Sequence, residues 1–433
     1  FVGNTHPETT VTGTSMTRAY HLAHEIIKKH VHAGPDDVIL TTGTGMTGAV
    51  SKFQRILGLR VPEQFTDLIR LPESQRPVVF VTHMEHHSNH TSWLETVADV
   101  ECILPDRNGL IDLNYFEDLL RKYRGRKTKI ASVTACSNVS GIQTAYHDIA
   151  RMVHQHGGFC FVDFACSAPY VEIDMHPEDP LAKLDAIYFS PHKFLGGPGS
   201  SGVLIFDSKL YKNRVPDMPG GGTVTWTNPW GEHHYFEDIE IREDGGTPGF
   251  LQGIKAALAV RLKEEMGVEK MLRREKEILP ILFQGLNKIE GLHILAGNIE
   301  ERLGVVSFYI DGLHFNLVVK LLNDRFGIQT RGGCSCAGTY GHYLLNISKE
   351  LSHKITSKID EGDYSAKPGW VRISIHPIMS DDEIHFIVEA VNQVAKHGKT
   401  WQEDYRYDPH TNEFTHVSSE QMEARRVERW FES

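Results

Sequence analysis

Short apolar runs alternate with helix-length amphipathic segments from the start of the chain to about residue 207. Runs such as "VVFVT", "FCFVDF" and "GVLIFD" are almost continuously apolar, which is typical of strands buried on both faces. This alternation predicts an α/β fold with a mainly parallel sheet covered by helices. The ligand crevice of such a sheet lies beyond the carboxyl ends of its strands, so we look for functional residues there.

A second, smaller lobe is expected after this region. A long helical stretch leads into the strand-like runs "RLGVVSFYI" and "WVRISIHPI", which are interleaved with helical segments. This order predicts a small α+β domain. We therefore expect a large domain over residues 1–262, a small domain over 263–400 and a polar C-terminal tail over 401–433.

The composition narrows the function classes. The 433-residue chain has a net charge of -11, which argues against nucleic-acid binding. No run approaches the ~20 apolar residues of a membrane span. The six cysteines show no disulfide-framework spacing, which fits a reducing, cytoplasmic location. The chain starts at Phe1 without a charged-then-apolar leader, so we expect no secretory signal and a trimmed or incomplete N-terminus.

The glycine-rich stretch "TGTGMTGAV" matches the pattern G-x-G-x-x-G between a strand and a helix. A dinucleotide site would also need an acidic residue at the end of a second strand ~20 residues on. Glu63 lies at that distance but follows Pro62 outside any strand pattern. The helix N-terminus still suits a phosphate group of some kind, and a tight turn without a ligand is the alternative.

The stretch "THMEHHSNHTSW" contains four histidines, which suggests a metal site. Zinc ligands at His83 and His87, or at His86 and His90, would share a face only on a helix, whereas the preceding strand predicts a loop here. The motif HExxH is absent. A metal site at Cys334 and Cys336 would lack a second cysteine pair with suitable spacing, so we expect no metal.

Two other residues suit an aldehyde cofactor, pyridoxal 5′-phosphate (PLP). This cofactor needs a lysine for covalent attachment and a carboxylate that keeps its pyridine nitrogen protonated. Asp163 in "VDFACSAP" and Lys193 in "YFSPHKFLGGPG" both lie at predicted strand ends. Burial and cationic neighbours would favour the neutral, nucleophilic amine of this lysine.

Eight motifs together resemble the class V, fold-type I PLP enzymes, and within them the cysteine desulfurases and selenocysteine lyases. The resemblance runs from about Val38 to about Ala395 through "TTGTGMTGAV", "THMEHHSNHTSW", "TACSNVSGIQT", "GGFCFVDFACSAP", "FSPHKFLGGPGSSGVL", "GGTPG", "IQTRGGCSCAG" and "GWVRISIHP". It implies the PLP-dependent transferase fold, an amino-acid substrate and a homodimer with a shared active site. A separate protein that accepts the sulfur is also possible within the family.

The resemblance also assigns roles to individual residues. Lys193 matches the Schiff-base lysine, Asp163 the partner of the pyridine nitrogen and His86 the imidazole that stacks on the ring. Residues matching the phosphate site are Thr44, Gly45, Met46, Ser190 and His192, with Thr247 reaching it from the other subunit. Asn138 matches a residue near the cofactor's phenolic oxygen or the substrate, and Arg372 matches the arginine that binds the substrate carboxylate. Cys166 stands where the desulfurases usually have a glutamine or histidine that contacts the phenolic oxygen, so the resemblance places Cys166 among the cofactor-binding residues.

The cysteines of "TRGGCSCAGTYG" suggest the reaction. Cys336 aligns best with the desulfurase nucleophile, and Cys334 precedes it by two residues. A nucleophilic thiolate needs a cation nearby, such as Arg331 or a charged histidine. The resemblance therefore implies a C–S lyase that forms alanine and a persulfide on Cys336. A class V aminotransferase, or another PLP-dependent lyase with a different amino acid, is the alternative, because one fold supports several reactions.

Overall fold

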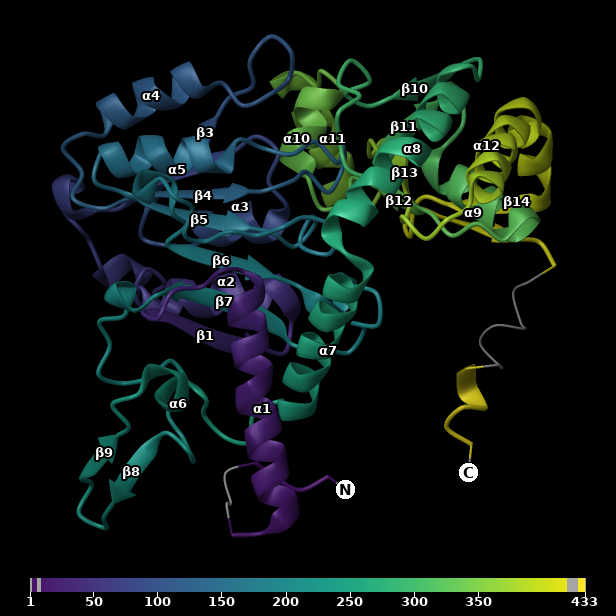
Figure 1. Ribbon diagram of the computed structural model, residues 1–433. Helices are drawn as coiled ribbons and strands as arrows, with labels where there is room; N and C mark the ends of the chain where they lie inside the picture. Colours follow the sequence, from purple (N-terminus) through teal and green to yellow (C-terminus); the bar gives the residue numbers. More distant parts are fainter. Residues whose placement is uncertain (1, 6–8, 419–426, 433) are drawn as a thin grey trace. The chain divides into compact units, whose positions relative to one another are not determined.

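The computed structural model describes residues 2–5, 9–418 and 427–432, and the chain divides into two compact units (Figure 1). Unit 1 is formed by residues up to 137 and by residues 143–272. Unit 2 is formed by residues 138–142 and by residues from 273 onward. The short segment 138–142 therefore belongs to unit 2, although unit 1 continues on both sides of it in the sequence.

Unit 1 is built on a seven-stranded sheet with the order β1-β7-β6-β5-β4-β2-β3. The neighbours from β6 through β3 run parallel, and β7 is antiparallel to both β6 and β1. This confirms the predicted mainly parallel sheet. The strands are β1 (Asp37–Thr42), β2 (Val78–Thr82), β3 (Asp99–Ile103), β4 (Lys129–Thr134), β5 (Phe159–Asp163), β6 (Ala186–Phe189) and β7 (Gly202–Asp207).

Helices cover both faces of this sheet. Apolar residues of α2 and α3 share one buried cluster with side chains from alternate positions of the strands, whereas α4 and α5 lie side by side on the other face (Figure 1). The helix α4 starts where Asp112 accepts hydrogen bonds from two first-turn N–H groups. The helices are α1 (Val11–His30), α2 (Gly45–Ile56), α3 (His87–Leu94), α4 (Leu113–Lys122), α5 (Tyr146–Gln155), α6 (Ile239–Glu243) and α7 (Phe250–Met266).

Unit 2 has a four-stranded antiparallel sheet with the order β10-β11-β13-β12. Its core lies between this sheet and apolar faces of α8, α9 and α12. A capping box between Ser380 and Glu383 starts α12. The elements are α8 (Val268–Asn287), β10 (Leu292–Ile294), β11 (Val305–Ile310), α9 (Phe315–Phe326), β12 (Arg331–Gly333), α10 (Gly338–Leu344), α11 (Lys349–Asp360), β13 (Trp370–Ser374) and α12 (Asp381–Trp401).

Two hairpins complete the described chain. The strands β8 (Val224–Thr227) and β9 (His233–Tyr235) form one in unit 1. The strands β14 (Tyr405–Asp408) and β15 (Glu413–His416) form the other, within the segment that composition described as a polar tail. Tyr405 and Phe414 of this second hairpin are buried in the core of unit 2. In the described part of the chain, no helix has the length and apolar character needed to cross a membrane.

Candidate active site

Asp163 and Lys193 come together at the carboxyl ends of neighbouring strands in unit 1. Asp163 is the last residue of β5, is almost fully buried, and its Oδ1 accepts a hydrogen bond from Ala165 N at 2.8 Å. Burial raises the pKa of Asp163 to about 6, although the Ala165 N–H and the charge of Lys193 act in the opposite direction. Lys193 ends a short 3₁₀ helix, Pro191–Lys193, between β6 and β7. It is exposed, so the expected burial of this lysine was wrong.

The glycine-rich turn between β1 and α2 packs against the turn that carries Lys193. Met46 N donates a hydrogen bond to Ser190 Oγ at 2.8 Å. Gly45 has φ +62°, and a Cβ there would lie 2.6 Å from His192 Cε1 and 2.9 Å from Ser190 Oγ. The turn therefore requires glycine both for its backbone conformation and for space.

The N-terminus of α2 has the features of an anion site. Among the described residues, Thr44 at its N-cap makes no side-chain hydrogen bond to the helix. The backbone N–H groups of a first turn point along the helix axis, and the helix dipole adds positive potential there. The structure thus brings together five of the residues assigned to the phosphate: Thr44, Gly45, Met46, Ser190 and His192.

A cavity of about 720 Å³ in unit 1 is lined by Thr44 and His192 and also by Thr247. The resemblance assigns Thr247 to the phosphate site of a neighbouring subunit. In this structure Thr247, in the loop that follows α6, lines the same cavity as Thr44 and His192 of its own chain. A role in a shared site stays a prediction.

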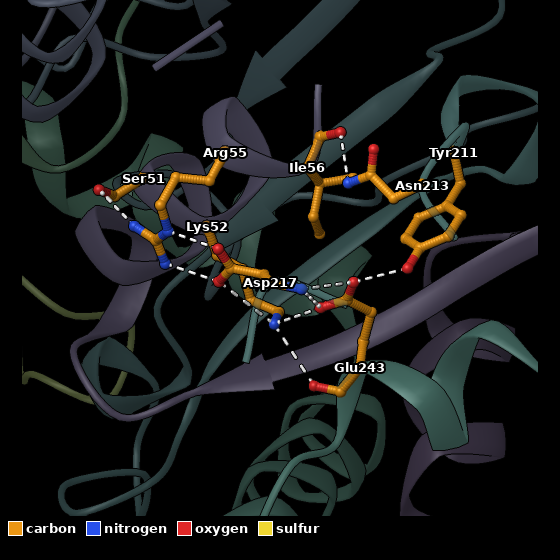
Figure 2. A network of polar contacts seen from close by, with 8 residues as sticks. All are labelled: Ser51, Lys52, Arg55, Ile56, Tyr211, Asn213, Asp217 and Glu243. Atoms are coloured by element: carbon orange, nitrogen blue, oxygen red, sulfur yellow. Dashed lines mark hydrogen bonds and ion pairs between the residues drawn. The ribbon is translucent and has the colours of Figure 1, made fainter. Parts of the chain in front are cut away.

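A buried ion cluster joins α2 to the segment that leads to Thr247 (Figure 2). Lys52 Nζ lies 2.7 Å from Glu243 Oε2 and 3.6 Å from Asp217 Oδ2. The Arg55 guanidinium donates to both oxygens of Asp217 at 2.6 and 2.8 Å. Tyr211 donates to the second oxygen of Glu243. Because Lys52 is two turns from Gly45 and Glu243 is four residues before Thr247, the cluster connects both walls of the cavity.

The histidine cluster differs from the expected loop. His87 and His90 lie in α3, and His86 is the N-cap residue of this helix. The loop prediction was wrong because histidine is not a usual helix-capping residue. Here the His86 Nδ1 accepts the hydrogen bond from Ser88 N at 3.1 Å, as a Ser or Asp side chain usually would. His83 instead contacts Gly109 O through its Nε2 at 3.2 Å. Across residues 2–5, 9–418 and 427–432, no group of three or more potential ligands could hold a metal ion.

Glu85, inside the same motif, is a residue to which sequence reasoning gave no role. Its carboxylate is buried and accepts hydrogen bonds from Thr82 N and Oγ1, from Thr134 N and from Asn89 Nδ2. Burial raises the pKa of Glu85 to about 8, and the charge of Asp163 also raises it. Its position in the sequence, between the end of an apolar strand and His86, was the signal that could have indicated a role for Glu85 near the site.

Unit 2 holds the predicted carboxylate-binding arginine. Arg372 on β13 lies opposite Arg331 on β12 in the register of the sheet. Like charges at directly opposed positions are unfavourable in a sheet. A role of Arg372 in binding the substrate carboxylate stays a prediction. Arg372 Nη1 donates to Asn138 O at 3.0 Å, and Asn138 Nδ2 donates to Ser335 O at 2.7 Å. Asn138 Oδ1 is buried and accepts no hydrogen bond from any described residue.

The two loop cysteines lie in the turn between β12 and α10. Both thiols are free and partly exposed. Arg331 Nη2 donates a hydrogen bond to Cys336 Sγ at 3.2 Å, so a cation lies beside that sulfur. Arg331 is one of the cations that the sequence analysis expected beside the reactive cysteine. In unit 1, Cys166 Sγ contacts Ser137 O at 3.7 Å.

Comparison with known proteins decides the family. The model of the family described as Aminotransferase class-V matches residues 1–387 of the chain. The chain belongs to the class V aminotransferase family. This confirms the resemblance stated from the motifs.

Among class V proteins, the chain is similar to cysteine desulfurases. It is 28% identical over 344 residues to a probable cysteine desulfurase from Halalkalibacterium halodurans, covering 77% of each chain. It is 26% identical to a cysteine desulfurase from Haloferax volcanii, covering 79% of this chain and 78% of the relative. The fold matches the apo structure of a cysteine desulfurase from Thermococcus onnurineus, with a TM-score of 0.72, 24% identity and coverage of 91% and 88%.

Proposed function

We propose that this class V enzyme is a PLP-dependent cysteine desulfurase, which converts cysteine to alanine and leaves a persulfide on Cys336. The observation that carries the proposal is the 3.2 Å contact between Arg331 Nη2 and Cys336 Sγ. A thiol beside a cation suits nucleophilic attack on the substrate sulfur, a step that an aminotransferase reaction does not include. The similarity to proteins named cysteine desulfurases supports the same reaction.

The residues of unit 1 fit PLP. The cradle of Gly45, Ser190 and His192 at the start of α2 has the backbone donors and dipole that a phosphate requires. Asp163 is buried, and burial raises its pKa to about 6. A carboxylate removed from water in this way is stabilised by a cationic hydrogen-bond donor, such as a protonated pyridine nitrogen. Lys193, at the same edge of the sheet, supplies the amine. When bound, PLP withdraws electrons from the α-carbon of an amino-acid substrate.

Three side chains of unit 1 take part in the proposed reaction. The Lys193 amine removes the α-proton of the substrate and returns a proton later in the cycle. The Asp163 carboxylate would keep the pyridine nitrogen of the cofactor protonated. His86 would pack on the face of the cofactor ring, and its Nδ1 accepts a hydrogen bond from Ser88 N. Because Nδ1 accepts this hydrogen bond, the ring proton lies on Nε2.

Unit 2 supplies the remaining groups in this proposal. The Arg372 guanidinium binds the substrate carboxylate, for which a planar fork of donors is well suited. The Cys336 thiolate attacks the substrate sulfur, so that an S–S bond forms and the C–S bond breaks. Cysteine and the enzyme thiol are thus converted to alanine and an enzyme persulfide. A homodimer and a separate sulfur-acceptor protein complete the proposal by family resemblance.

A product assay tests this function. The purified enzyme, loaded with PLP, is incubated with cysteine and with a panel of other amino acids, and products are identified by mass spectrometry. We expect alanine and sulfide from cysteine, and loss of both in Cys336→Ser and in Lys193→Ala by at least ~10²-fold. Lys209→Ala, at an exposed lysine after β7, is the control. Formation of a keto acid, or full alanine production by Cys336→Ser, would show a different reaction.

A further inference from the structure

We propose that Cys334 is a second sulfur carrier, which receives the outer sulfur of the persulfide formed on Cys336. The proposal rests on the desulfurase function and adds a step to it. It assigns a role to the thiol that the primary reaction leaves unused. Sulfur would then leave the enzyme from Cys334.

The two cysteines occupy the first and third positions of one tight turn. Ala337 N donates to Cys334 O at 2.9 Å, which closes a four-residue turn. The central residues Ser335 and Cys336 have φ +52° and +57°. Two consecutive positive φ angles are characteristic of a type I′ turn, which normally contains glycine or asparagine. Each such conformation costs an ordinary L-residue about 1–2 kcal/mol, so the surrounding structure must maintain it.

Ser335, between the cysteines, is the anchor of this turn. It is buried, and its carbonyl accepts a hydrogen bond from Asn138 Nδ2 at 2.7 Å. Trp370 Nε1 lies 3.2 Å from its hydroxyl oxygen. Both flanking thiols remain partly exposed. Ser335 therefore fixes the centre of the turn, while the cysteines before and after it in the chain stay partly exposed. A strained backbone that is held in this way is typical of functional sites.

The spacing of the two residues permits direct exchange between their sulfurs. Two consecutive Cα–Cα steps of ~3.8 Å keep the cysteine Cα atoms within ~7.6 Å of each other even when extended, and a turn shortens this distance. Cysteines that react with each other usually have Cα atoms ~4.4–6.8 Å apart.

Arg331 distinguishes the two thiols, because its guanidinium contacts Cys336 Sγ. Its guanidinium donates a hydrogen bond to Cys336 Sγ, and a cation in that place favours the departure of Cys336 as the leaving group. In the transfer step, the Cys334 thiolate attacks the outer sulfur of the Cys336 persulfide. One S–S bond forms and one breaks, and Cys336 leaves as a thiolate beside the guanidinium. No oxidant or reductant is consumed, and Cys336 is ready for another substrate.

The position of the persulfide can be measured directly. The full-length enzyme with PLP is mixed with cysteine, quenched with an alkylating reagent at successive times and digested. Both cysteines lie in one tryptic peptide, residues 332–349, so fragmentation assigns the extra sulfur. We expect the label on Cys336 first and on Cys334 later. In Cys334→Ser the label should stay on Cys336, and steady-state turnover should fall at least ~3-fold relative to the first turnover.

Controls separate this proposal from the primary function. Cys102→Ser removes a thiol whose pKa burial raises to about 12, and it should behave as wild type. No label on Cys334 at any time, with normal label on Cys336, would overturn the transfer and leave the desulfurase intact. Absence of label on both cysteines with alanine still produced would overturn the desulfurase proposal itself.

Discussion

The carboxylate of Glu85 accepts a hydrogen bond from the backbone N–H of Thr134 at 2.8 Å, and Thr134 is the β4 residue that pairs with Asp163 on β5. Glu85 thus connects the histidine motif that follows β2 to the strand end that carries Asp163. Its Oε2 also accepts from Asn89 in the first turn of α3. The orientation of His86 therefore depends on a buried group that is not expected to touch the cofactor.

The first prediction concerns the pH dependence of stability. Burial raises the pKa of Glu85 from 4.5 to about 8, so between these values the folded protein binds a proton that the unfolded chain has lost. The free energy of unfolding then falls as pH rises through this window. Glu85→Gln should make this slope less negative by up to ~1.4 kcal/mol per pH unit. Urea unfolding at several pH values measures it.

Glu275→Gln is the matched control for that experiment. Glu275 lies in unit 2, and burial raises its pKa to about 7. This variant should also flatten the slope but leave the visible absorbance of bound PLP unchanged, whereas Glu85→Gln should alter that absorbance. Identical slopes in Glu85→Gln and wild type would contradict the prediction.

The second prediction concerns the phosphate cradle. Gly45→Ala would place a Cβ 2.6 Å from His192 Cε1 at a backbone with φ +62°, so PLP affinity should fall at least ~10-fold, equivalent to ~1.4 kcal/mol. Gly58→Ala carries the same backbone cost at φ +68°, but no atom lies within 4 Å of the new Cβ. It should lower stability only. Equilibrium dialysis and thermal melting compare the two variants, and equal PLP affinities would exclude a steric role.

The third prediction concerns the ion cluster of Figure 2. Lys52→Met leaves the buried carboxylates of Glu243 and Asp217 without their shared cation, so it should lower the free energy of unfolding by ~3–5 kcal/mol. Arg55→Met should cost only ~1 kcal/mol because the arginine side chain is 43% exposed. Denaturant unfolding provides both values. A loss in Lys52→Met no larger than in Arg55→Met would contradict this account.

The fourth prediction concerns thiol reactivity. Arg331→Gln removes the guanidinium beside Cys336 Sγ, so alkylation of Cys336 by iodoacetamide at neutral pH should slow at least ~3-fold. Arg273→Gln changes an exposed arginine of the same unit and should leave the rate unchanged. Peptide mass spectrometry follows the modification of each cysteine. Unaltered alkylation in Arg331→Gln would remove the electrostatic argument for Cys336 as the nucleophile.

Sequence patterns predicted the parts of the fold that depend on local periodicity. Continuous apolar strands predicted the parallel sheet, and polar residues at strand ends located Asp163 and Lys193. The start of α3 was missed because a histidine replaces the usual capping residue. The role of Glu85 was missed because its partners Thr134 and Asn89 become neighbours only through the order of strands in the sheet. Long-range pairing of this kind leaves no local pattern.

The segment 138–142 has a practical consequence for dividing this protein into fragments. Asn138 O and Val139 O accept hydrogen bonds from Arg372 and Ser307, and Gly141 O accepts one from Leu303 N. A C-terminal fragment that begins at residue 273 would therefore lack a stretch to which its own sheet is hydrogen-bonded. Recombinant halves of this enzyme should be designed as complementing pairs, with the middle peptide supplied, and not as autonomous modules.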